Sequence, residues 1–309
     1  MMIEVLKIQN ALERGNTMEN ILKKGNVEIG VYSKGAELYS YKVDGKEFMW
    51  ERNPEFWGSS SPILFPFVGV IKNGNYEYSG KHYELKTRHG FARDNIFELS
   101  GKGENFIEFK FSSNEKTLEI YPFKFELYIK YTIIDDMLEI QYKVINNSDE
   151  KMYFSIGAHP AFALEINEKI NLEDYYIELE QSEKAKRIPL KENGLAFEIE
   201  SSEYFLDEKD KIKLNGQIFD EDAIIFENLK SQIVMIKCEK STRKVEIDYK
   251  DFPFIAFWSK PGASFVCIEP WYGITDFENS TGKLEDKKGI QKLDKNSEFR
   301  AKFTIKANL

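Results

Sequence analysis

Apolar and polar residues alternate along much of this 309-residue chain, and this period of two is its most constraining feature. Alternation puts every second side chain on one face of an extended strand, so it predicts strands with one buried and one wetted face. Long stretches of helical periodicity are nearly absent. The clearest alternating segments are 105–111, 126–134, 137–146, 175–180, 232–238, 244–250 and 299–308.

Tight turns separate these segments. Glycine, asparagine and aspartate tolerate the positive φ angles of hairpin turns, so pairs of them between two alternating segments favour antiparallel pairing. No linker, low-complexity tract or short repeat divides the chain. We therefore predict an all-β fold, a large antiparallel β-sandwich. The turn-forming pairs are Asp44-Gly45, Asn73-Gly74, Ser79-Gly80, Asn193-Gly194 and Asn215-Gly216.

The first seventeen residues do not share the strand pattern. Residues 3–14 could form a short amphipathic helix, whereas the strand-turn-strand pattern begins at Met18. We predict that residues 1–17 are an extension outside the fold and that residues 18–309 form a single domain.

Charge and cysteine content narrow the possible partners and location. The net charge of −9 argues against nucleic acid or an anionic membrane as partner, because both bind basic surfaces. No apolar run approaches the length of a membrane span, and no signal peptide is evident. Cys238 and Cys267 lie in separate apolar strand patterns, as free buried thiols of a cytoplasmic protein would. We expect a cytoplasmic monomer or homodimer without nucleic-acid or membrane partners.

Two of the three histidines stand in tight local contexts. His159, in IGAHPAF, is held extended by the proline that follows it, and this proline removes the next backbone donor. His89, in TRHGFARD, precedes a glycine that permits close backbone approach. Each could be a structural histidine at a turn, but histidine is the side chain best suited to exchange protons near neutral pH. His82 lies in a polar alternating segment, where we expect it to be exposed.

One carboxylate follows an apolar run that is expected to be buried. Glu269 comes after Phe-Val-Cys-Ile and before Pro270-Trp271. Such a carboxylate is either paired or partly desolvated with a raised pKa, and both conditions are typical of a working acid or base. The alternatives are a carboxylate that hydrogen-bonds a loop and a tryptophan that belongs to the core.

Several motifs in order resemble one known family. LFPFVGVIKNGNYEYSGKHYEL, HGFARD, GAHPAF and CIEPWYGITD resemble the aldose 1-epimerase (galactose mutarotase) family, and in particular its bacterial LacX-like branch. The resemblance extends from about residue 19 to residue 306, and the ordered set is more specific than any single motif. It implies a large antiparallel β-sandwich, in agreement with the alternation. It also implies interconversion of the α and β anomers of a galactose- or glucose-type aldohexose, without metal or cofactor.

The resemblance also implies roles for individual residues. It makes Glu269 the general base at the end of its strand and His159 the general acid, an imidazolium on the opposite side of the anomeric centre. His89 corresponds to a second histidine that helps to hold the ring-oxygen side. Asp222, in FDEDAIIF, resembles an aspartate that binds sugar hydroxyls.

The sequence departs from the family at one position. Members often carry an arginine in the segment after LFP, where this chain has Val70. Lys72 or Arg93 could supply the missing donor, so the choice of sugar is open.

Aromatic side chains could stack on a sugar ring, although core packing is the more common role for any one aromatic residue. The candidate platforms are Trp57, Phe162, Trp258 and Trp271.

Two other functions stay open. A mutarotase for phosphorylated hexoses would need cations for the phosphate, with Arg52, Lys72, Arg88 and Arg93 as the supply. A non-catalytic sugar-binding protein would have lost the acid or the base.

Overall fold

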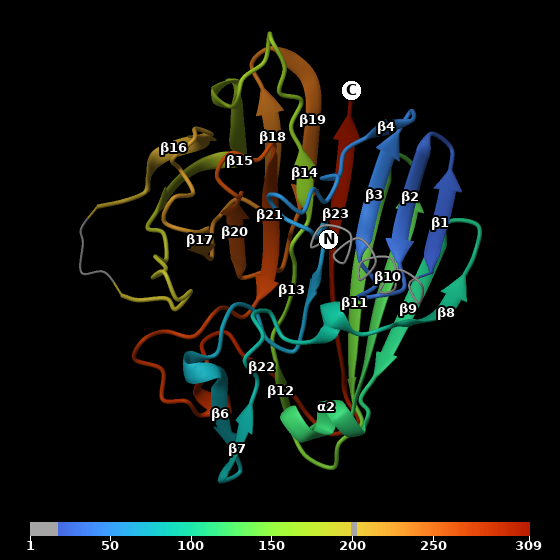
Figure 1. The fold of residues 1–309 in the computed structure, drawn as a ribbon, viewed down its shortest axis with the longest axis vertical. Helices are drawn as coiled ribbons and strands as arrows, with labels where there is room; N and C mark the ends of the chain where they lie inside the picture. The colour runs from blue at the N-terminus through green and yellow to red at the C-terminus, as the bar shows by residue number, and fades with distance from the viewer. Residues whose placement is uncertain (1–17, 199–202) are drawn as a thin grey trace, which may run out of the picture.

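The computed structural model describes residues 18–198 and 203–309, so the expected extension, residues 1–17, lies outside the described part. The fold is all-β, as predicted, and every pairing between its strands is antiparallel (Figure 1). Within the described ranges, one short helix, α2 (Glu115–Ile120), and four 3₁₀ turns interrupt the strands; the turns are η1 (Lys72–Gly74), η2 (Ala92–Asp94), η3 (Leu172–Asp174) and η4 (Leu284–Asp286). Nowhere in the described residues is a helix both long and apolar enough to cross a membrane.

The largest sheet has nine strands and contains all seven of the alternating segments predicted from the sequence. In β10, for example, buried and partly exposed residues alternate from Phe125 to Ile133 because one face of the sheet meets the core. In spatial order the strands are β16 (Leu206–Lys213), β15 (Tyr175–Ala185), β18 (Ile233–Cys238), β19 (Ser241–Asp248), β23 (Glu298–Asn308), β11 (Met137–Asn146), β10 (Phe125–Ile134), β9 (Phe106–Ser112) and β8 (Glu98–Lys102).

A four-stranded sheet at the N-terminal end, blue in Figure 1, joins the sandwich. Its Asp44-Gly45 pair forms a tight turn with positive φ angles of 50° and 77°, as the sequence indicated. Ser79-Gly80 closes the β6–β7 hairpin in the same way. The strands are β1 (Glu19–Lys24), β2 (Val27–Tyr32), β3 (Leu38–Val43) and β4 (Lys46–Glu47), with the hairpin strands β6 (Asn75–Tyr78) and β7 (Lys81–Glu84).

The third large sheet has six strands and carries the residues of the site. Its edge strand β5 (Ile63–Leu64) lies between two prolines, which cannot donate to a further strand. The other strands are β13 (Ile156–Ala158), β21 (Phe265–Tyr272), β20 (Phe254–Trp258), β17 (Ile224–Glu227) and β14 (Ala161–Ala163), while β12 (Met152–Phe154) and β22 (Gln291–Leu293) form a separate pair.

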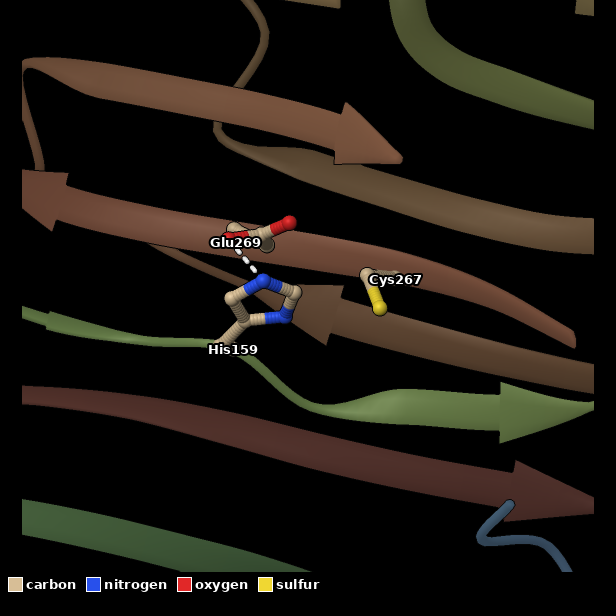
Figure 2. A group of neighbouring side chains, drawn as sticks. All are labelled: His159, Cys267 and Glu269. Atoms are coloured by element: carbon tan, nitrogen blue, oxygen red, sulfur yellow. Dashed lines mark ion pairs between the residues drawn. The ribbon is translucent and has the colours of Figure 1, made fainter. Parts of the chain in front are cut away.

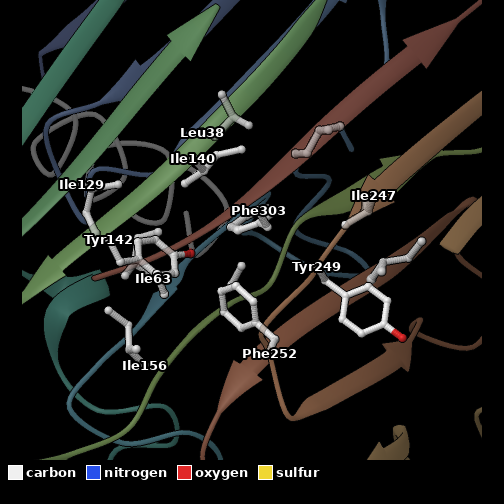
Figure 3. Packing of buried hydrophobic residues seen from close by; sticks show 14 of the residues in the cluster. Leu38, Ile63, Ile129, Ile140, Tyr142, Ile156, Ile247, Tyr249, Phe252 and Phe303 are labelled. Carbon is white, nitrogen blue, oxygen red and sulfur yellow. The ribbon is translucent and has the colours of Figure 1, made fainter. Parts of the chain in front are cut away.

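The three large sheets meet in one hydrophobic core (Figure 3). Leu38 comes from the four-stranded sheet, Ile140 and Phe303 from the nine-stranded sheet, and Ile63 and Ile156 from the six-stranded sheet. All five are buried, and burial of such side chains is the main favourable contribution to folding.

The six-stranded sheet is buried on both faces. Along β21, Val266 and Ile268 belong to the large core, whereas Cys267 and Trp271 belong to two smaller clusters on the opposite face. Because side chains alternate along a strand, Glu269 lies on the face of Cys267 and Trp271. That face carries the candidate site.

Candidate active site

A cavity of about 280 Å³ lies on the face of the six-stranded sheet that carries Glu269. Its volume is near the lower end of the usual range for small-molecule sites, roughly 300–1,000 Å³. The sequence-predicted site residues that line it are His89, Arg93, His159, Asp222, Glu269 and Trp271.

Glu269 and His159 meet at the floor of this cavity. Glu269 projects from β21 opposite Ala256 of β20, and His159 lies in the short connection between β13 and β14, where Pro160 interrupts the strand. The carboxylate Oε2 lies 3.4 Å from the imidazole Nε2, and the two side chains are 1% and 9% exposed (Figure 2). The pair is therefore close enough to exchange a proton with little motion.

Burial changes the proton affinity of both groups. Desolvation raises the pKa of Glu269 well above its ordinary value; the nearby Asp222 adds to this effect and Arg88 opposes it. Desolvation, with help from the charges of Arg93 and Arg88, lowers the pKa of His159 to about 3. The free site therefore favours a neutral carboxyl group beside a neutral imidazole. The lowered pKa disfavours an imidazolium at His159 in the free site, because burial removes the solvation of its charge.

Aromatic rings hold the His159 imidazole in place. Trp57 stacks on it with ring centroids 4.8 Å apart, and Trp258 meets it edge-on at 5.6 Å. Both tryptophans, named above as possible platforms, line the cavity. The imidazole is thus fixed by packing as well as by the backbone before Pro160.

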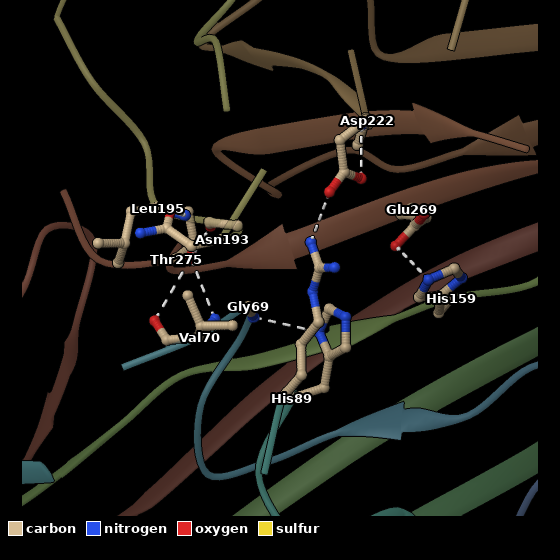
Figure 4. A network of polar contacts seen from close by, with 12 residues as sticks. Gly69, Val70, His89, His159, Asn193, Leu195, Asp222, Glu269 and Thr275 are labelled. Carbon is tan, nitrogen blue, oxygen red and sulfur yellow. Dashed lines mark hydrogen bonds and ion pairs between the residues drawn. The ribbon is translucent and has the colours of Figure 1, made fainter. Parts of the chain in front are cut away.

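His89 is fixed in a defined tautomer. The imidazole Nδ1 accepts a hydrogen bond from the backbone N–H of Gly69 at 3.1 Å (Figure 4). The backbone N–H of His89 in turn donates to the Gly69 carbonyl at 2.7 Å. Burial lowers the pKa of His89 well below its ordinary value. The neutral ring therefore carries its proton on Nε2, where it can donate to a ligand.

A substitution of Gly69 tests whether its hydrogen bonds with His89 position the imidazole. Gly69 has a φ of +73°, and a Cβ there would lie 2.3 Å from the Cβ of Thr275. Gly69→Ala is expected to lower the free energy of unfolding by roughly 1–3 kcal/mol and to raise KM, because the strained backbone turns His89 away. Urea denaturation and steady-state kinetics measure both.

Gly45→Ala is the matched control for this substitution. Gly45 has a φ of +77° but no atom within 4 Å of the added Cβ, so it reports backbone strain alone. If the two variants lost equal stability and kept equal KM, the contact with Thr275 would have no role.

Asp222 and Arg88 form the rim of the cavity. The Arg88 guanidinium donates to Asp222 Oδ2 at 3.0 Å, and the Asp222 Oδ1 accepts the N–H of Ala223. Asp222 has a φ of +70° and His89 has one of +68°, both unusual for residues with a Cβ. Such conformations cluster at functional sites because packing elsewhere must hold them.

Three expectations about placement are wrong. Lys72 does not line the cavity, because the η1 turn directs its Nζ to the Ser280 carbonyl at 3.1 Å. Phe162 is fully buried in the large core, because β14 turns it away from the site. Glu269 is not at a strand end, since β21 continues through Pro270 to Tyr272.

The sequence analysis missed some cavity residues. Thr275, in the quoted GITD motif, accepts from the Val70 N–H and donates to the Gly194 carbonyl, and so joins two loops at the site. Phe56 and Lys260 also line the cavity but lie in loops without a recognisable pattern. Thr275, Phe56 and Lys260 come from three different loops, and only the folded chain brings these loops together at the cavity.

One group within the described residues has the composition of a metal site. A nitrogen of His159, the sulfur of Cys267 and an oxygen of Glu269 lie within 4.8 Å of one another (Figure 2). Burial raises the pKa of the Cys267 thiol well above its ordinary value, as it does that of Glu269. Protonated ligands oppose metal binding, so this environment favours the neutral trio.

Comparisons with known proteins identify the family of this chain. The Protein LacX sequences of Lactococcus lactis subsp. lactis, one plasmid-borne and one chromosomal, are each 33% identical over 88% of this chain and 93% of theirs. The structure of a galactose mutarotase related enzyme from Lactobacillus acidophilus is 36% identical, with a TM-score of 0.89 over 94% of this chain and 98% of that one. A galactose mutarotase-like protein from Lactobacillus casei is 25% identical, with a TM-score of 0.85 over 94% and 100%. The profile of the aldose 1-epimerase family matches residues 19–297, and the chain belongs to this family.

Proposed function

We propose that this protein interconverts the α and β anomers of an aldohexose by acid–base ring opening and closure. The observation that carries the proposal is the buried Glu269–His159 pair, 3.4 Å apart at the floor of a sugar-sized cavity. Membership of the aldose 1-epimerase family supports an isomerase that acts on a sugar.

The pair can supply both proton transfers that the reaction needs. The anomeric hydroxyl and the ring oxygen are bonded to the same carbon, so an adjacent acid and base can reach both; the groups need not lie on opposite sides of the sugar. Moving the one proton of the pair from Glu269 to His159 creates a carboxylate base and an imidazolium acid. The carboxylate then takes the hydroxyl proton while the imidazolium protonates the ring oxygen, and the C1–O5 bond breaks.

The open-chain sugar then closes again by the reverse steps. Rotation about the C1–C2 bond presents the other face of the carbonyl carbon to the O5 hydroxyl. The hydroxyl proton returns to His159 and the carbonyl oxygen takes the proton of Glu269, which leaves the single proton of the pair on His159. Its transfer back to Glu269 restores the neutral resting pair. His89, through its Nε2–H, is placed in this proposal to donate to the ring-oxygen side.

The direct test is to follow a freshly dissolved pure anomer. α-Glucose and α-galactose are expected to equilibrate faster with catalytic amounts of the protein than in buffer alone, as measured by polarimetry and by anomer-resolved NMR. Sugar binding without acceleration for every aldose tested would instead identify a non-catalytic sugar-binding protein.

The pH profile tests the protonation of the pair. Because the pKa of His159 is lowered to about 3, kcat/KM is expected to stay level from about pH 7 to 5, where an ordinary histidine (pKa about 6.5) gains its proton. It is expected to fall as the pH rises through the raised pKa of Glu269, since the pair then loses its proton. An acid limb with its midpoint near 6.5 would contradict this assignment.

A phosphorylated hexose is the second candidate substrate. Arg93 lines the cavity, and among the described residues its guanidinium has no ion-pair partner. A free guanidinium suits a phosphate group. A higher kcat/KM for glucose 6-phosphate than for glucose, lost in Arg93→Gln, would favour this candidate.

A further inference from the structure

A wider hollow adjoins the catalytic cavity. This hollow, which we term the outer groove, has a volume of about 1,170 Å³ and continues past the rim towards Phe197 and Asp220. The cavity and the outer groove share five lining residues, so a ligand can extend from one into the other. The shared residues are Arg88, Leu190, Asp222, Trp258 and Lys260.

Exposure increases from the floor of the cavity to the groove. The side chains of Glu269 and His159 are 1% and 9% exposed, whereas those of Asp222 and Arg88 at the rim are 25% and 45% exposed. A pyranose whose anomeric carbon meets the buried pair therefore has the opposite end of its ring at the rim. In a hexopyranose that end bears C4 and, beside it, C6. In this orientation, a substituent on the C4 or C6 hydroxyl would extend into the outer groove.

The charges of the outer groove favour a neutral occupant. Four cationic and four acidic side chains line it, so its net formal charge is zero. Ion pairs already neutralise most of the cations: Arg88 pairs with Asp222, Arg187 with Glu221, and Lys191 with Glu278. A dianionic group would gain little attraction here.

The remaining lining suits a second sugar ring. The carboxylates of Asp220 and Glu192 are exposed and have no hydrogen-bond or ion-pair partner within the described residues, so they can accept bonds from hydroxyls. Phe197 and Trp258 are half-buried and line the groove; the Lys191 ammonium lies over one face of the Phe197 ring, 5.5 Å from its centroid, so the ring has its other face for a ligand. A sugar ring carries both hydroxyl groups and an apolar C–H surface. Carboxylates that accept hydrogen bonds from hydroxyls, next to an aromatic ring, suit both parts of it.

We propose that the outer groove binds a second hexose unit, so that the preferred substrate is a reducing disaccharide linked through the 4- or 6-hydroxyl of its reducing ring. This inference rests on the proposed anomerase function, and it adds the substrate class. The second unit takes no part in ring opening. Its binding energy is the same in ground and transition states and lowers KM without changing kcat.

Maltose and glucose are the probes, with anomerisation followed by NMR. The KM for maltose is expected to be about tenfold lower than that for glucose, equivalent to ~1.4 kcal/mol of binding, with similar kcat. Phe197→Ala is expected to raise the KM for maltose about fivefold and to leave the kinetics with glucose unchanged. Tyr204→Ala is the matched control, because Tyr204 is an exposed aromatic residue outside both hollows.

Each outcome separates this inference from the proposed function. If glucose is converted but maltose has the same or a higher KM, or if Phe197→Ala affects both sugars equally, the second unit has no site. If glucose 6-phosphate has a lower KM than maltose, the groove or rim serves a phosphate and the disaccharide inference is wrong. If no sugar is converted, the proposed function itself fails.

Discussion

Glu269→Gln is expected to lower kcat by about 10²–10⁴-fold, because glutamine has the shape of glutamate but cannot take a proton from the anomeric hydroxyl. The loss is expected in kcat and kcat/KM together, since the proton is transferred only on the way to the transition state. Calorimetric titration is expected to show that the variant still binds sugar. Because Glu269 is buried and its charge is disfavoured there, the neutral amide is expected to preserve the fold.

Glu183→Gln is the matched control for this substitution. Glu183 is also buried, but it lies on β15 outside the cavity, where one carboxylate oxygen accepts from the N–H of Ser231 at 2.7 Å and from its hydroxyl at 2.8 Å. This variant is expected to lose about 1–3 kcal/mol of stability and to retain kcat. If Glu269→Gln converted anomers as fast as the unmodified protein, Glu269 would not be the base.

His159→Ala is expected to lower kcat by about 10²–10⁴-fold for the complementary reason, loss of the acid that protonates the ring oxygen. It also removes one of the two rings that stack on Trp57, while Phe265 stays stacked on it, so a modest fall in thermal stability is expected beside the kinetic effect. Circular dichroism and thermal unfolding measure the fold, and polarimetry measures kcat.

His82→Ala controls for the loss of an imidazole as such, since His82 is exposed on β7. It is expected to change neither kcat nor stability. Added imidazole is expected to restore part of the activity of His159→Ala, because the deleted ring leaves space for it beside Glu269. Unfolding of His159→Ala under assay conditions would instead assign His159 a structural role.

The nine-stranded sheet, which has one buried and one solvent-exposed face, is the part of the fold that could be predicted from the sequence. All seven alternating segments belong to the nine-stranded sheet, where the period of two reflects a real difference between core and solvent. β20 and β21 are buried on both sides, so their sequences FIAFW and FVCIEPWY show no alternation. The sheet that carries the site therefore has the weaker sequence signal.

Sequence motifs predicted which segments contribute residues to the site, but they did not predict which way each side chain points. His89, His159 and Glu269 lie in quoted motifs, and all three line the cavity. Lys72 also lies in a quoted motif, but the geometry of a single turn directs its long side chain elsewhere. The protonation of the pair depends on complete burial by residues far away in sequence, which no local pattern records.

The two-sided burial of β21 affects how this protein can change over time. Glu269 stands between Ile268 and Pro270, and Ile268 packs in the core shared by all three large sheets, so moving the carboxylate would disturb the interior of the whole molecule. The rim residues Asp222 and Lys260 lie in loops between strands and carry no such constraint. Descendants of this chain are therefore expected to acquire new sugar preferences through loop substitutions while their acid–base chemistry stays as it is.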